Sequence, residues 1–298
     1  MNEAEARRVH ALKRFAVALT LFVIVGREFL GLEGSWLQAV VSVGTGLAVV
    51  CLMETAAAFF QNRKNTLLRS KKDAFFLLLP AYIAPTSISF LLYSGDALAP
   101  FALGAGSAMC SKDIFRAPFY GRYRHVLNPA CLGICVALYL LPNTGVAPPY
   151  QYIENLGSPG EVILILFILY AGFFINTVFT DRIFVFYGFV GGFFLQALFR
   201  AILQDTSFLA NLVPMTGTAF ILFAFYMVTD PATSPLKRGN QLIFGLANAA
   251  MYGILQYYNV VYGLFYALTI VCALRGLWWY WVSWQHAREN EPELAVAA

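Results

Sequence analysis

The stretch EVILILFILYAGFFINTVF, residues 161–179, decides the fold class of this chain. Only the first of its nineteen residues is charged. A helix that crosses the roughly 30 Å hydrocarbon core of a bilayer needs about 20 mostly apolar residues. We therefore expect a transmembrane helix here.

Comparable apolar stretches recur along the whole chain. Backbone groups in lipid must be paired internally, and the strand alternation of a membrane β-barrel is absent, so each stretch is expected to be a helix. The sequence thus predicts an all-α polytopic membrane protein of about ten transmembrane helices. The fourth and fifth are short, and the ninth is weakly apolar. The predicted spans are 15–32, 37–60, 75–93, 97–111, 127–141, 161–179, 183–203, 208–229, 241–257 and 260–283.

The composition agrees with a membrane protein. Hydrophobic residues make up 59% of the 298 residues and charged residues only 12%, whereas a soluble domain carries roughly 25% charged residues. This excludes a soluble enzyme and a disordered chain. The net charge of +4 reflects topology, so no nucleic-acid partner is expected.

The distribution of basic residues predicts the orientation. With the N-terminus in the cytoplasm, seventeen of the 20 lysines and arginines fall in inside segments, and only Arg27 and Arg200 fall outside. Such a bias is typical of cytoplasmic loops. We therefore expect both termini inside, with a cytoplasmic segment 1–14, a ten-helix domain 15–285 and a cytoplasmic tail 286–298.

Two predicted spans contain residues that interrupt helices. The fourth carries Pro100, Gly104 and Gly106, and the eighth carries Pro214 and Gly217. Interrupted helices at matching places in two halves of a chain point to a binding site in transporter-like folds. The matching pattern suggests a weak internal repeat, although shared composition explains it equally well.

Two polar positions lie at the predicted inner ends of spans. Asn128-Pro129 is typical of a helix start, and a helix N-terminus can also bind an anion such as a flavin phosphate. Asp230-Pro231 is typical of a turn in which aspartate bonds its own backbone. The Asp230 carboxylate could alternatively hold a cation or a ligand hydroxyl.

Other polar residues lie within the spans. Glu54 and Arg275 have similar depths, so an ion pair between them is one interpretation. Cys131 and Cys135 share a helix face, and small apolar filler is the favoured interpretation over a metal site. Four amides are expected to join helices: Asn176, Gln196, Asn211 and Asn248. No nucleophile–base set, phosphate loop or metal motif is recognisable in the sequence.

The stretches VLNPACLG (126–133) and FYMVTDPATSPLKRGNQLIFG (225–245) resemble the membrane subunit shared by two redox-driven ion pumps. These are the RnfD protein of the bacterial Rnf electron-transport complex and the NqrB protein of the sodium-translocating NADH:quinone oxidoreductase. The resemblance implies ten helices, a bacterial cytoplasmic (inner) membrane location, partner membrane subunits and flavin. It is stronger still to a branch found in enediyne antibiotic biosynthesis clusters, on the segments 112–134, 145–156 and 215–235.

One family feature is missing. The pump subunits carry FMN on the threonine of an S/T-G-A-T motif in an outside loop. The nearest strings here, Thr144-Gly145-Val146-Ala147 and Thr216-Gly217-Thr218-Ala219, have alanine in the acceptor position. Covalent FMN is therefore not expected, whereas a non-covalent flavin, FMN or riboflavin, is compatible with the sequence.

Three functions follow from these observations. The first is a flavin-binding redox subunit, the second a transporter or exporter of a small molecule or ion, and the third a membrane scaffold that binds cytoplasmic partners through its basic loops. The predicted substrate or flavin site lies between the fourth and eighth spans and the start of the fifth. Its residues are Asn128, Pro129, Gly217, Thr229, Asp230, Lys237 and Arg238.

Overall fold

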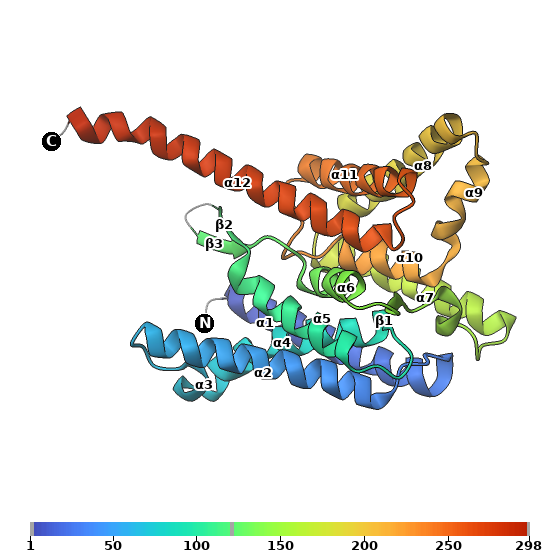
Figure 1. Cartoon of the computed structure of the whole chain (residues 1–298), viewed down its shortest axis with the longest axis horizontal. Helices are drawn as coiled ribbons and strands as arrows, with labels where there is room; N and C mark the ends of the chain where they lie inside the picture. The colour runs from blue at the N-terminus through green and yellow to red at the C-terminus, as the bar shows by residue number, and fades with distance from the viewer. Residues whose placement is uncertain (1–2, 120–121, 297–298) are drawn as a thin grey trace. The chain divides into compact units, whose positions relative to one another are not determined.

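The computed structural model describes residues 3–119 and 122–296, with side chains for 12–118 and 123–285 (Figure 1). The chain divides into two compact units. Unit 1 comprises Met1–Cys110, Pro129–Gly172 and Pro214–Leu222, and unit 2 comprises Ser111–Asn128, Phe173–Val213 and Phe223–Ala298. Two helices run from unit 1 into unit 2, namely α5 (Ala99–Ile114) and α7 (Ser158–Phe174).

Unit 1 is built around α4 (Lys71–Leu91), against which α1, α2 and α6 pack. Its other elements are α1 (Glu3–Val25), the π-helix η1 (Gly26–Leu30), α2 (Trp36–Phe60), α3 (Thr66–Arg69), α6 (Pro129–Leu140), the 3-10 helices η2 (Pro149–Tyr152) and η4 (Val213–Thr216), and α10 (Thr218–Leu222). Strands β1 (Leu92–Tyr93) and β4 (Gly145–Val146) pair antiparallel, with Leu92 opposite Val146.

Local sequence explains how unit 1 is held together. Ser35 and Gln38 form a reciprocal capping box that starts α2. Pro80 and Pro85 lie inside α4, where each removes a backbone donor. The Ser42 hydroxyl of α2 donates to the Pro85 carbonyl at 2.8 Å, so a side chain of a neighbouring helix pairs with the backbone near the second proline.

Unit 2 is built on the close contact between α8 (Ile183–Gln204) and α11 (Arg238–Tyr257), with α12 (Gly263–Val296) packed against α11. Its other elements are β2 (Arg116–Phe119), β3 (Arg122–His125), the π-helices η3 (Ile175–Phe179) and η5 (Phe223–Met227), and α9 (Phe208–Leu212). Strands β2 and β3 form an antiparallel hairpin, with Arg116 opposite His125.

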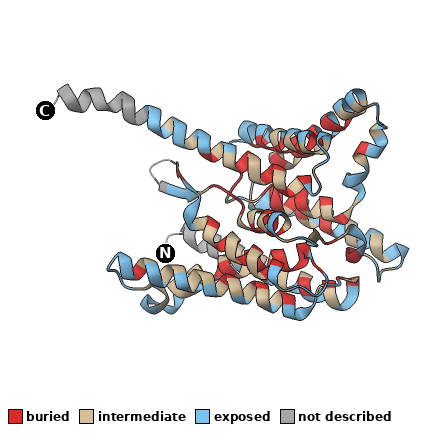
Figure 2. Cartoon of the chain, viewed as in Figure 1, coloured by how far each residue is buried: buried red, intermediate tan, exposed pale blue. Residues whose placement is uncertain are grey.

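Exposed residues lie along several helices (Figure 2), and many of them are large and apolar. On α7, Ile163, Phe167 and Tyr170 are each more than 60% exposed. Such continuous apolar faces are costly in water and favourable in lipid. The protein is therefore an all-α polytopic membrane protein, as the sequence predicted.

Five helices of the described residues are long and apolar enough to cross a membrane, and a sixth span is added if one bent pair counts. The five are Trp36–Phe60, Lys71–Leu91, Ser158–Phe179, Ile183–Gln204 and Gly263–Gln285. Every one of the ten predicted segments falls on a helical segment. Of the others, α6 has 12 residues, which is roughly 18 Å of helix and too short to span alone. The number of ten crossings and the orientation stay predictions.

The eighth predicted span is broken and the fourth is not. Phe208–Thr216 and Thr218–Met227 are bent by 73° at Gly217. In contrast, α5 is continuous through Gly104 and Gly106, so the expected interruption of the fourth span is wrong. Pro100 is the second residue of α5, in the first turn, where a missing backbone donor disturbs no helical hydrogen bond. The internal repeat was predicted from interruptions in both spans, and the structure shows an interruption in the eighth span but not in the fourth.

Candidate functional site

A tight turn follows the π-helix η5 and presents Asp230. One carboxylate oxygen, Oδ1, accepts a hydrogen bond from the Ala232 backbone at 3.1 Å, and Oδ2 accepts one from the Thr233 hydroxyl at 3.1 Å. The Asp230 carbonyl accepts from the Ser234 backbone at 2.8 Å. The expected turn, in which an aspartate bonds its own backbone, is therefore confirmed.

Asn128 reaches this turn from a distant part of the chain. Its side-chain amide donates to Asp230 Oδ2 at 3.4 Å. The preceding segment is held by α12, since a Cβ on Gly276 would lie within 3.0 Å of the Val126 side chain. As predicted, α6 begins at Pro129, directly after Asn128.

Two arginines that the sequence did not assign to the site converge on the same turn. Arg182 is buried between η3 and α8, and its Nε donates to the Ser234 hydroxyl at 3.0 Å. Arg275 of α12 donates through Nη1 to the Thr233 carbonyl. Its guanidinium lies over the Trp279 ring, 4.4 Å from the centroid. Both side chains are thus fixed by hydrogen bonds or stacking beside Asp230.

The charges around the turn influence one another. Lys112 and Arg182 lie close enough to Asp230 to stabilise its negative charge, and Arg124 lies within electrostatic range of both Arg182 and Arg275. We call this group the Asp230 cluster. It consists of Lys112, Arg124, Asn128, Arg182, Asp230, Thr233, Ser234 and Arg275, all in unit 2.

Burial dominates the electrostatics of the cluster. It raises the pKa of the Asp230 carboxyl group above the ordinary 3.8, against the hydrogen bonds from Ala232 and Thr233. Burial also lowers the pKa of Arg182, an effect that Asp181 and Asp230 oppose. With four basic side chains around one central carboxylate, the cluster is suited to an anionic or acceptor-rich ligand.

The remaining predicted residues have different surroundings. Thr229 is buried, and its hydroxyl donates to the Phe225 carbonyl of the preceding π-helix η5. Lys237 is the residue before α11, and the exposed Arg238 lies 3.8 Å from the Asp181 carboxylate. Unit 2 thus contains five of the seven predicted residues, and two of them, Asn128 and Asp230, are joined by a hydrogen bond.

The other two predicted residues, Pro129 and Gly217, belong to unit 1. Gly217 marks the bend described above, and a Cβ there would meet Pro149 at 3.4 Å. Neither residue takes part in the Asp230 cluster. The predicted convergence of the fourth, fifth and eighth spans on one site stays a prediction.

The predicted Glu54–Arg275 ion pair is wrong. Both carboxylate oxygens of Glu54 bind the guanidinium of Arg63, at 2.6 and 2.9 Å, and Oε1 also accepts from the Thr66 backbone at 2.7 Å. Residues that directly follow α2 therefore neutralise and hydrogen-bond the Glu54 carboxylate. The glutamate raises the pKa of Arg63, chiefly through the side-chain hydrogen bond.

The sequence also singled out two cysteines and four amides within the predicted spans. Among the described residues no group of three metal-binding side chains occurs, and Cys131 and Cys135 are buried and take no part in a disulfide. Two of the four amides join helices, as expected. Asn176 donates to the Phe225 carbonyl at 2.8 Å and Asn211 to the Ala197 carbonyl at 3.2 Å. Gln196 and Asn248 instead bond within their own helices.

A signal for Arg182 was present in the sequence. Thr180-Asp181 precedes it and Thr229-Asp230 begins the site turn, and each Thr-Asp pair follows a π-helix, η3 or η5. Such π segments occur frequently at functional sites. Arg275 had a weaker signal, a single charge inside an otherwise apolar span.

Fold and cluster together define a multi-pass α-helical membrane protein with a basic, polar cluster around the Asp230 turn. The sequence pattern of the NQR2, RnfD, RnfE family matches residues 150–282. This match contains the Asp230 turn and Arg182 and supports an Rnf/Nqr-type membrane protein. It does not extend to Asn128. No curated protein matches the sequence.

Proposed function

We propose that this chain is the integral membrane subunit of an Rnf- or Nqr-type electron-transport complex, and that the Asp230 cluster binds a flavin without a covalent bond. The observation that carries the proposal is the position of the family-like segment. Within the family match, Thr229–Ser234 forms the turn on which Arg182 and Arg275 converge. The partners would be other membrane subunits, in a bacterial cytoplasmic membrane.

The side chains of the cluster fit such a cofactor. FMN or riboflavin presents ring carbonyl and nitrogen acceptors, and FMN adds a phosphate, all of which pair well with guanidinium groups. Arg182 and Arg275 would orient the ring or phosphate, while Asp230 and Thr233 would accept from its donors. A bound flavin supplies one- and two-electron transfer. The protein would supply the orientation and the positive potential that favours a reduced, anionic ring.

The burial of the Thr144 hydroxyl agrees with a flavin that is bound without a covalent bond. Thr144 lies in the string that most resembles the attachment motif, and its hydroxyl oxygen is buried with no hydrogen-bond partner among the described residues. A buried hydroxyl is poorly placed to be flavinylated. The segments 112–134, 145–156 and 215–235 further support a place in the branch found in enediyne biosynthesis clusters.

Transport of a small molecule or ion is the second candidate function. It is favoured by the 73° bend between Phe208–Thr216 and Thr218–Met227. A bend within a membrane span frees backbone groups that need partners or a water-lined cavity. In that case the Asp230 cluster would bind the transported substrate.

The visible absorption spectrum of the purified protein tests the first function. We expect flavin bands in the wild type and their loss in Arg182→Gln, which removes a buried charge from the cluster. Arg200→Gln is the matched control, because Arg200 is a half-buried arginine of α8 whose Nε donates to Gln204 of the same helix at 3.3 Å. A colourless wild-type protein, purified from flavin-replete cells, would exclude the redox role and leave transport.

A further inference from the structure

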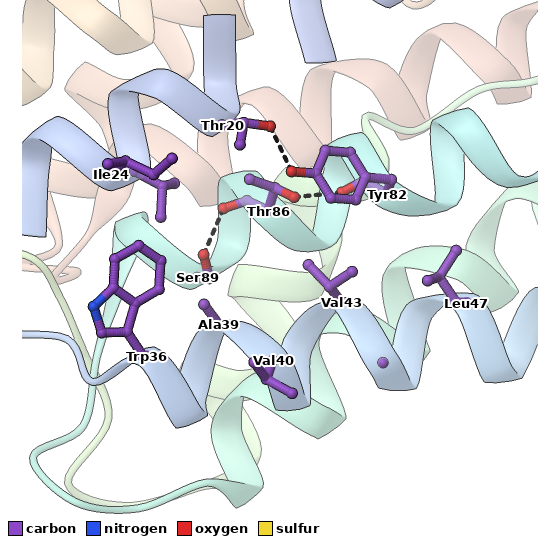
Figure 3. A pocket seen from close by; sticks show the side chains of 12 residues that line it. Thr20, Ile24, Trp36, Ala39, Val40, Val43, Leu47, Tyr82, Thr86 and Ser89 are labelled. Carbon is purple, nitrogen blue, oxygen red and sulfur yellow. Dashed lines mark hydrogen bonds between the residues drawn. The ribbon is translucent and has the colours of Figure 1, made fainter. Parts of the chain in front are cut away.

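A long apolar groove lies on unit 1, far in sequence from the Asp230 cluster (Figure 3). It has a volume of about 460 Å³ and is lined by α1, α2 and α4. Ile24 and Trp36 lie at one end, and Leu47 lies toward the other (Figure 3). The volume is within the usual range of small-molecule sites.

The groove exists because two helices share one partner. Both α1 and α2 pack on α4 but make few contacts with each other. On α2 the close contact with α4 is made by Gly46, where a Cβ would lie within 3.0 Å of Pro85. Gly44, two residues earlier, borders the groove, and a Cβ there would meet nothing within 4 Å.

The polar atoms that line the groove already have partners within the protein. The Thr20 and Tyr82 hydroxyls are 2.5 Å apart, the Thr86 hydroxyl donates to the Tyr82 carbonyl at 2.7 Å, and the Ser89 hydroxyl donates to the Thr86 carbonyl at 2.8 Å. These bonds are drawn in Figure 3. The groove therefore favours an apolar occupant, such as a hydrocarbon chain.

A positive charge lies beside one end of the groove, where Arg27 contacts two of the lining residues, Trp36 and Ser89. The Arg27 guanidinium lies 5.2 Å from the Trp36 ring centroid, and it donates to the Gly34 carbonyl at 2.7 Å and to the Ser89 carbonyl at 3.0 Å. Its third nitrogen, Nη1, is buried and has no hydrogen-bond partner in the described part of the chain. No carboxylate of the described residues lies within ion-pair distance of Arg27.

We propose that this groove is a lipid site that holds one acyl chain of an anionic phospholipid, with the phosphate beside Arg27. The hydrocarbon chain would cover the apolar faces of α1 and α2. The headgroup would supply the negative charge that Arg27 lacks among the described residues. A single arginine near a membrane surface attracts an anionic lipid by about fivefold.

Native mass spectrometry of the protein, extracted with phosphatidylglycerol or phosphatidylcholine, tests the proposal. We expect the wild type to retain one phosphatidylglycerol about fivefold more than phosphatidylcholine. Arg27→Gln should lose this preference and still retain lipid. Gly44→Phe should fill the groove and lose both lipids. Equal retention of the two lipids by the wild type would overturn the proposal.

Gly191→Phe is the matched control. Gly191 is also an exposed helical glycine at which a Cβ would meet nothing within 4 Å, but it lies on α8 of unit 2. We expect wild-type lipid retention in this variant and unchanged helical circular dichroism in all variants. Equal lipid loss in Gly191→Phe and Gly44→Phe would overturn the proposal. So would a wild-type dimer that Gly44→Phe separates without loss of lipid, because a second copy would then occupy the groove.

Discussion

The Asn128 amide donates to the Asp230 carboxylate at 3.4 Å, joining two residues 102 positions apart. This distance exceeds the usual 2.9–3.0 Å of such bonds. Asp230 makes shorter bonds at 3.1 Å to Ala232 and Thr233 within its own turn. The bonds within the turn therefore hold Asp230 more tightly than the Asn128 amide does.

Replacing Asp230 with asparagine should separate ligand binding from stability. Asparagine keeps an oxygen acceptor for the Ala232 backbone and removes the charge. Because burial raises the pKa of Asp230, the carboxylate costs folding free energy at neutral pH. We expect Asp230→Asn to unfold at the same or a higher temperature and to bind flavin about tenfold more weakly, as loss of a charge-assisted bond predicts.

The pH dependence gives a second measurement of the same variant. A carboxyl group whose folded-state pKa is raised binds its proton more tightly in the folded protein. Its contribution to stability is fully present below the ordinary 3.8 and is lost as pH rises through the folded-state pKa. The advantage of Asp230→Asn should thus appear as pH rises through that range. Exposed Asp205 supplies the control Asp205→Asn, and a wild type that gains stability over this range relative to Asp230→Asn would contradict us.

A hydrogen bond between two π-helices should contribute to the stability of unit 2. Buried Asn176 of η3 donates to the Phe225 carbonyl of η5 at 2.8 Å. Asn176→Ala should lower the free energy of unfolding by about 0.6 kcal/mol, the average measured for such bonds in membranes, and by no more than about 1.7 kcal/mol, the largest value. Asn248→Ala is the control, because the Asn248 amide donates within α11. Denaturation in mild detergent would measure both, and an equal loss would argue against the inter-helix role.

The sequence predicted the helices better than the site. Apolar length alone located ten helical segments, because a bilayer-sized run of apolar residues leaves little other choice. It could not tell that Pro100 lies in the first turn of α5 and does not break the helix, since that depends on where the helix begins. Arg182 and Arg275 were missed because their partners, Ser234 and Thr233, are 52 and 42 positions away.

Any flavin in this protein should leave it on denaturation. Neither Thr144 nor the pair Thr216 and Thr218 lies in the attachment motif, and Thr218 is 2% exposed. After denaturing electrophoresis, the band should show no flavin fluorescence under ultraviolet light. A fluorescent band that disappears on substituting Thr144, Thr216 or Thr218 with alanine would show that one of them is an acceptor.

The loop around Tyr150 should face the outside of the cell. The bias of basic residues toward alternate loops predicts it, and η2 (Pro149–Tyr152) lies between the fifth and sixth predicted spans. A phosphatase fused after residue 150 should be active, and one fused after residue 64, in the predicted inside loop, should not. Activity only after residue 64 would show that the predicted orientation is inverted. Equal activity at both positions would show that the predicted number of crossings between them is wrong.

The contact between α8 and α11 should tolerate no side chain at Gly245. A Cβ there would lie within 3.0 Å of the Val185 carbonyl oxygen and the Phe189 backbone nitrogen. Backbone atoms cannot move aside as a flexible side chain can, so the helices would have to separate. We expect Gly245→Ala to lower the free energy of unfolding by about 1–3 kcal/mol, and Gly245→Leu to prevent accumulation of folded protein. Gly239 lies on the same helix, and a Cβ there would meet nothing within 4 Å, so Gly239→Ala should be neutral. Thermal unfolding of the purified variants would measure the difference. If Gly245→Ala is as stable as Gly239→Ala, α8 and α11 do not pack through their glycines.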